Sequence, residues 1–275
     1  MPFPLILLLS LMISFAASGP ARAQASARLP SQCQAIAENL PKARLVAFDA
    51  GAPLVAQAEQ GTVMITFLGH STFLIETPGG VTIATDYNGA YRPDPPPTVV
   101  TMNKAHMTHY TLVPDPAIRH VLHGWGDDGA GPALHYLEVG DVLVRNVTTD
   151  IRSYGGMEPD ANSIFIFEVA GLCIGHLGHL HHELDPTHYA AIGRLDVVMV
   201  PVDGGLTMGA QSMSRVVKQL RSALILPMHR RGPPIDSFLA MFDGDFDRRF
   251  SGSASVSVAL GSLPRRPLIL VLDGV

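Results

Sequence analysis

The stretch that decides the fold is Val63-Met-Ile-Thr-Phe-Leu-Gly-His-Ser-Thr-Phe-Leu-Ile-Glu76. It holds two short apolar runs, separated by a glycine and a histidine, and each run is typical of a strand. Thr77-Pro-Gly-Gly80 then makes a good turn. Strands are expected at Val63–Leu68, Thr72–Glu76, Val81–Thr85 and Thr98–Met102. This part of the chain therefore predicts a series of successive strands.

The second half of the chain alternates strand patterns with helical ones. Strands are expected at Val139–Val147, Ser163–Val169, Leu172–His176, Asp196–Val202 and Ala223–Met228, and helices at Pro186–Ile192 and Ser212–Arg221. The strand–helix–strand order from Leu172 to His229 contrasts with the hairpins before it. Two sheets packed face to face with helices outside would satisfy both halves. We therefore expect an α/β fold in one large domain, residues 61–275.

The N-terminus has the pattern of a secretory signal. Leu5–Ala17 is apolar and has the length of a signal-peptide core, and Ala21-Arg-Ala23 supplies small residues for cleavage after position 23. The run is short for a membrane span, although an uncleaved anchor stays open because no Lys or Arg precedes it. We expect a signal peptide at 1–23 and an extension at 24–60 with a short helix at 34–40. The mature chain is expected to be a periplasmic or secreted bacterial protein without stable membrane insertion.

Composition excludes some partners. Hydrophobic residues make up 47% of the chain and charged residues 16%, with a net charge of −5. No basic stripe suggests nucleic acid. Two cysteines, Cys33 and Cys173, could pair in an oxidising compartment. Sequence cannot show their proximity, so the expectation leans slightly to two separate thiols.

Histidines gather at the ends of expected strands. The clusters are Lys104-Ala-His106-Met-Thr-His109, His176-Leu-Gly-His179-Leu-His-His182, and His229. Strand ends that share a sheet edge converge on a crevice, and neutral imidazole is a common ligand for zinc and related metals. The pattern predicts a metal site with His106, His109, His179 and His229 as ligands. The histidines at 120, 123, 135 and 188 lack such placement and are expected in loops or on the surface.

Several segments together resemble the metallo-β-lactamase superfamily, in particular its branch of ascorbate-6-phosphate lactonase-like metal hydrolases. They are Phe67–Glu76, Thr85-Asp86, His176–His179, Val200-Pro-Val-Asp-Gly204 and Leu226-Pro-Met-His229. The resemblance spans most of the expected domain. It implies a four-layer αββα sandwich with a site for one or two metal ions at its edge. It also implies hydrolysis by metal-activated water.

The chain departs from the family signature His-x-His-x-Asp-His. Lys104 stands for the first histidine, Thr108 for the aspartate, and His179 for a later bridging aspartate. These changes remove ligands that a second metal ion needs. Three imidazoles, from His109, His179 and His229, with an open position would still match a catalytic zinc site. We therefore favour one ion, zinc, with iron or manganese possible.

Other residues receive supporting roles. Asp86 and Asp203 are expected to accept the remaining ring N–H of a ligating histidine, and His70 to line the same edge. Lys104 would be spare to bind an anionic group of the substrate. His182 is a candidate proton carrier at the mouth of the site, while His176 is expected to be structural.

These features indicate an exported metal-dependent hydrolase whose metal-activated water attacks a small-molecule substrate. A non-catalytic metal- or ligand-binding protein is the alternative, because the altered signature is compatible with a lost hydrolytic centre. An iron-dependent redox or sulfur-handling protein is a further alternative, since this fold supports more than hydrolysis. The sequence leaves the substrate and the oligomeric state open.

Overall fold

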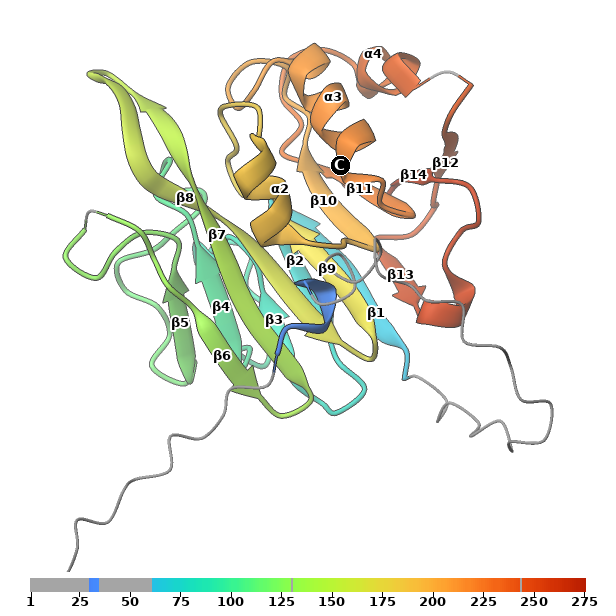
Figure 1. Ribbon diagram of the computed structural model, residues 1–275. Coiled ribbons are helices and arrows are strands. Elements are labelled where there is room, and N and C mark those ends of the chain that lie inside the picture. The colour runs from blue at the N-terminus through green and yellow to red at the C-terminus, as the bar shows by residue number, and fades with distance from the viewer. Residues whose placement is uncertain (1–29, 35–60, 130, 243) are drawn as a thin grey trace, which may run out of the picture. The chain divides into compact units, whose positions relative to one another are not determined.

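The protein is described by a computed structural model that covers residues 30–34, 61–129, 131–242 and 244–275 (Figure 1). Contacts divide the chain into Met1–Pro30 and a larger unit, Ser31–Val275, and the following concerns the larger unit. The predicted signal peptide and residues 35–40 of the predicted short helix lie outside the described residues. No helix in the described part is both long and apolar enough to cross a membrane.

The first sheet contains the two strands of the stretch Val63–Glu76. Its strands are β1 (Val63–Gly69), β2 (Thr72–Glu76), β3 (Thr82–Ala84), β4 (Val99–Met102), β5 (His120–His123) and β13 (Ser255–Val258), in the order β13-β1-β2-β3-β4-β5. β1, β2 and β3 pair antiparallel, whereas β3, β4 and β5 pair parallel. Parallel neighbours end at the same edge, which brings the loop after β4 beside the loop after β3.

The second sheet combines hairpins with parallel strands. Its strands are β6 (Tyr136–Val139), β7 (Val142–Ser153), β8 (Gly156–Val169), β9 (Leu172–His176), β10 (Val197–Pro201), β11 (Leu224–Met228), β12 (Asp247–Phe250) and β14 (Leu268–Val271). Their order is β12-β14-β11-β10-β9-β8-β7-β6. β9, β10, β11, β14 and β12 run parallel, so β9 and β11 deliver the residues that follow them to one edge.

The two sheets enclose the main core. Alternate residues of β1 and β2, such as Ile65 and Phe73, are fully buried and pack with Phe165 and Phe167 of β8. The alternating burial along most of β1 is the period-two pattern of a strand with one face toward a core. Burying each such side chain contributes about 1.5–3 kcal/mol before conformational entropy is counted.

Helices cover the outer face of the second sheet. They are α2 (Pro186–Ile192), α3 (Ala210–Leu220) and α4 (Ile235–Leu239), with the short 3-10 turns η2 (Ala240–Phe242) and η3 (Leu260–Ser262). Figure 1 shows α2, α3 and α4 on one side of that sheet. α3, which falls in the region of the helix predicted at Ser212–Arg221, buries Met213, Val216 and Val217 against it. Asp185 caps α2 and accepts backbone N–H groups of Thr187 and His188.

The expected α/β fold class is confirmed, and loops cover part of the outer face of the first sheet. On the outer face of the first sheet, a smaller cluster includes loop side chains, among them Tyr87 and Ile118, with Tyr110 and Trp125 packed against it. The helices α2, α3 and α4 instead bury their side chains on the outer face of the second sheet. β7 and β8 also extend beyond the predicted runs into a long hairpin, because their polar outer halves pair with each other from Ile151 to Glu158.

Cys33 and Cys173 form a disulfide, with Cα atoms 6.0 Å apart. The leaning toward separate thiols is therefore wrong. The two residues are 140 positions apart, and proximity arises only in the folded chain. The buried carboxylate of Glu168 helps to place the N-terminal segment, because it accepts the Ser31 hydroxyl at 2.5 Å and the Gln32 backbone N–H at 2.8 Å.

Candidate metal centre

Three segments carry histidines to one edge of the two sheets. His70 lies in the turn after β1 with a φ of 55°, and His106 and His109 lie in the loop after β4. His229 follows β11 directly, and its backbone N–H donates to the carbonyl of His70 at 2.6 Å. This bond links the strand end of the second sheet to the turn of the first.

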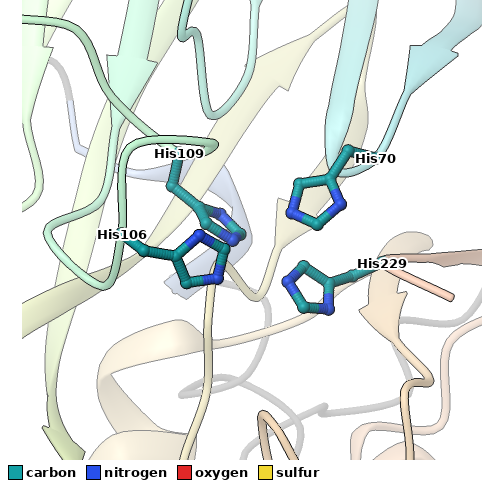
Figure 2. Close-up of side chains that lie close together, drawn as sticks. All are labelled: His70, His106, His109 and His229. Carbon is teal, nitrogen blue, oxygen red and sulfur yellow. The ribbon is translucent and has the colours of Figure 1, made fainter. Parts of the chain in front are cut away.

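The imidazoles form one compact group. One potential ligand atom from each of His70, His106, His109 and His229 lies within 4.8 Å of the others. Figure 2 shows the four rings turned toward a common space, with His106 and His109 carried on one loop. His179 adjoins this group: its Nε2 is 3.1 Å from Nε2 of His106, and its ring centroid is 4.7 Å from that of His109. The structure therefore brings together all four predicted ligands and His70.

His109 is held by a buried carboxylate. Its Nδ1 lies 2.5 Å from Oδ2 of Asp86, and Oδ1 of Asp86 accepts the Asn103 side-chain amide at 2.8 Å. Burial alone would raise the pKa of Asp86, but the neighbouring histidines and the hydrogen bonds from His109 and Asn103 lower it to about 2. An ionised Asp86 makes Nδ1 of His109 the protonated nitrogen. Its Nε2, which is buried without a hydrogen-bond partner in the described part, keeps a free lone pair.

His229 repeats this arrangement. Its Nδ1 lies 2.7 Å from Oδ2 of Asp203, close enough for an ion pair although not aligned as a regular hydrogen bond. Asp203 is fixed by backbone N–H groups of Gly205 and Thr207, at 2.8 and 2.9 Å. Burial opposes ionisation of Asp203, but these bonds and His229 hold its pKa below the usual range. Among the described residues, Nε2 of His229 also has no partner.

The group has the chemistry of a transition-metal site. Burial, followed by repulsion from neighbouring histidines, lowers the pKa of His70 to about 3 and of His106 to about 4, and places that of His179 far below its ordinary value. The rings of these three histidines are therefore neutral at pH 7 and able to ligate. Two buried Nε2 atoms without partners would each cost about 1–3 kcal/mol if left unsatisfied. Imidazole donors suit zinc, iron, nickel or copper better than magnesium or calcium.

Thr108 occupies the position where the family motif has aspartate. Its hydroxyl lies 2.6 Å from Nδ1 of His106 and 2.8 Å from Nε2 of His70. The hydroxyl thus bridges two rings of the group and brings no charge to it.

Lys104 and His182 have other contacts. The ammonium of Lys104 pairs with Glu158 at 2.5 Å and donates to the carbonyl of Gly129 at 2.7 Å, so its charge is already engaged. His182 accepts the backbone N–H of Asp150 on Nε2 and donates from Nδ1 to the carbonyl of Glu183. The structure does not bring His182 into the histidine group, and the predicted anion-binding and proton-carrying roles find no support in these contacts.

Two further histidines support the group from outside it. His176 donates from Nε2 to the carbonyl of Ser71 and accepts the Gly178 N–H on Nδ1, which is a structural pattern. His181, to which the sequence analysis gave no role, has its Nε2 2.6 Å from Nδ1 of His179. The spacing His179-x-His181 was the available signal, but nothing in it distinguishes an inward ring from a solvated one.

Comparisons with known proteins agree with this architecture. Two curated relatives, both UPF0173 metal-dependent hydrolases, come from Pyrococcus furiosus (26% identity, 63% of this chain and 87% of the relative) and Salinibacter ruber (25%, 66% and 92%). A crystal structure from Thermotoga maritima, assigned as a Zn-dependent hydrolase of the metallo-β-lactamase superfamily, is 28% identical with a TM-score of 0.54. It covers 76% of this chain and 98% of its own. A family profile described as the beta-lactamase superfamily domain matches residues 64–229, more than half of the chain. This protein therefore belongs to the metallo-β-lactamase superfamily.

Proposed function

We propose that the protein is an exported metal-dependent hydrolase that holds one transition-metal ion in its histidine group and acts on a small molecule. The observation that carries the proposal is the pair of buried, unpartnered Nε2 atoms of His109 and His229. A cation between them would satisfy both atoms. The reaction class is supported by the relatives, which are named metal-dependent hydrolases.

The residues that would hold the ion are imidazoles, and two carboxylates lie behind them. His109 and His229 would ligate through Nε2, with further nitrogens available from His106, His179 and His70. Asp86 and Asp203 contact the far sides of two rings and offset the charge of a divalent ion. When bound, such an ion acts as a Lewis acid and lowers the pKa of a water molecule toward neutrality.

The chain's own side chains prepare this chemistry by orientation. Asp86 holds the proton of His109 on Nδ1, so that Nε2 faces the site. The Thr108 hydroxyl fixes the relative position of the rings of His106 and His70. Because Thr108 stands where the family motif has a carboxylate and Lys104 pairs with Glu158, we propose that the site holds one ion and not two. We propose zinc as the single ion, because manganese favours oxygen donors.

Export is supported by two features. The apolar leader ends in a small-residue cleavage pattern, and the Cys33–Cys173 disulfide is of a kind that persists in oxidising compartments. We expect the periplasmic fraction of an expressing bacterium to contain a chain that starts at Gln24 and carries no free thiol. Intact-mass measurement before and after reduction checks this. A full-length chain in the cytoplasmic fraction would contradict the export proposal.

Hydrolysis is tested with a panel of chromogenic esters and phosphodiesters. We expect activity on at least one class of substrate. Chelation of the metal should lower this activity by roughly tenfold or more, and addition of Zn²⁺ should restore it. His120→Ala is a matched control, because His120 lies in β5 outside the histidine group. Activity that persists unchanged after verified removal of metal would contradict the proposal. Metal binding with no activity on the panel would favour the non-catalytic alternative, which the replacements at Lys104 and Thr108 also support.

A further inference from the structure

Three segments surround the histidine group at the edge of the sheets. The loop that carries His106 is tied to the β7–β8 hairpin by the Lys104–Glu158 ion pair. On the other arm of the hairpin, the guanidinium of Arg152 donates to the carbonyls of Gly205 and Leu206, at 2.9 and 3.0 Å. The hairpin, which extends past the neighbouring strands in Figure 1, therefore contacts both loops.

The same hairpin reaches the histidine group through His181. The backbone N–H of Arg152 donates to Nδ1 of His181 at 2.5 Å, and Nε2 of His181 lies 2.6 Å from His179. The two loops and the outer part of the hairpin thus form one rim around the group.

Large apolar side chains on this rim face solvent. Met107, between His106 and Thr108, is 77% exposed, and Leu206 is 57% exposed. Met157, which pairs with Arg152 across the hairpin, is 48% exposed. Single exposed apolar residues are ordinary, but three around one candidate site indicate a surface that binds an apolar group.

A cation lies in the loop after β11, beside the histidine group. Arg231 follows His229 by two residues and is exposed. Its charge adds to burial and to the neighbouring histidines in lowering the pKa of His106, so its guanidinium is within electrostatic range of that ring. In the described residues no carboxylate forms an ion pair with Arg231.

We propose that the substrate is an amphiphile, with an unbranched apolar chain that lies on Met107, Met157 and Leu206 and an anionic group that pairs with Arg231. That such a molecule is hydrolysed rests on the proposed function. That it is bound rests only on the side chains around the histidine group. The methionines are flexible and polarizable, which suits contact with a chain of variable length.

Binding is measured without turnover, by calorimetric titration of the protein with straight-chain carboxylates from butanoate to octanoate. Each buried methylene contributes about 0.8 kcal/mol, which corresponds to about a fourfold change in Kd. On a rim that stays partly open we expect Kd to fall about two- to fourfold per added methylene. Because no bond is hydrolysed, failure of the hydrolase assay would leave this result unaffected.

Variants assign the dependence to the rim. In M107S/M157S/L206S we expect Kd to become nearly independent of chain length. F250S is the control and should keep the dependence, because Phe250 is an exposed apolar residue on β12, at the far edge of the second sheet. Arg231→Gln should raise every Kd by roughly the same factor, about fivefold, because it removes one charge-assisted contact. A wild-type series without chain-length dependence, or a triple variant that retains it, would overturn the proposal.

Discussion

Replacing Cys33 by serine is expected to lower the free energy of unfolding by about 2–5 kcal/mol. The disulfide closes a loop across 140 positions, and a long loop removes much conformational entropy from the unfolded chain. It also fastens the segment Ser31–Cys33 to β9. The measurement is urea unfolding followed by circular dichroism, under oxidising conditions.

Two matched variants separate the bond from the other contacts of this segment. Cys173→Ser should match Cys33→Ser, and the double variant should add little to either, because all three lose the same bond. Ser31→Ala keeps the disulfide and removes the two hydrogen bonds of the Ser31 hydroxyl, which donates to Glu168 and accepts the Gln34 backbone N–H, so its effect should stay near about 1–2 kcal/mol. If both cysteine variants unfolded at the wild-type urea midpoint, the disulfide would not stabilise the fold.

Replacing Asp86 by asparagine is expected to weaken metal binding by about 10- to 100-fold. Oδ1 of Asp86 already accepts the amide of Asn103, so the new amide nitrogen would face Nδ1 of His109. That ring would then have to accept at Nδ1 and carry its proton on Nε2, which leaves no lone pair for the ion. The measurement is competition for Zn²⁺ against a chelating dye.

The effect should depend on position within the site. Asp203→Asn should weaken metal binding in the same direction, because Asp203 contacts His229 as Asp86 contacts His109. Asp141→Asn is the control: Asp141 accepts Thr77 and Gly79 in a turn of the first sheet and has no contact with the histidine group. Equal Zn²⁺ affinity in wild type and Asp86→Asn would contradict the role given to this carboxylate.

The strands nearest the histidines could be predicted because each combines an apolar run with a clear turn signal. β1, β2, β9 and β11 fall within a residue or so of the expected ranges. Of the strands that were not predicted, β12 (Asp247–Phe250) is exposed throughout and β13 (Ser255–Val258) lies at a sheet edge. Their strand conformation depends on pairing with distant neighbours, which leaves little trace in local periodicity.

The site was predictable in outline for a similar reason. Strand ends that share an edge bring His106, His109, His179 and His229 together. The partners of individual atoms were not predictable. Lys104 meets Glu158 because the β7–β8 hairpin extends farther than its apolar core suggests, and the Cys33–Cys173 bond depends on how the N-terminal segment docks.

The most direct test of the metal centre is metal content per chain, measured by elemental analysis on wild type and His109→Ala/His229→Ala. His120→Ala serves as the control, and circular dichroism verifies that each variant is folded. We expect about one zinc ion per wild-type and control chain, and little metal in the double variant, because it loses both carboxylate-backed ligands. Wild-type protein without metal after growth in metal-supplemented medium, or a folded double variant with unchanged metal content, would contradict this account.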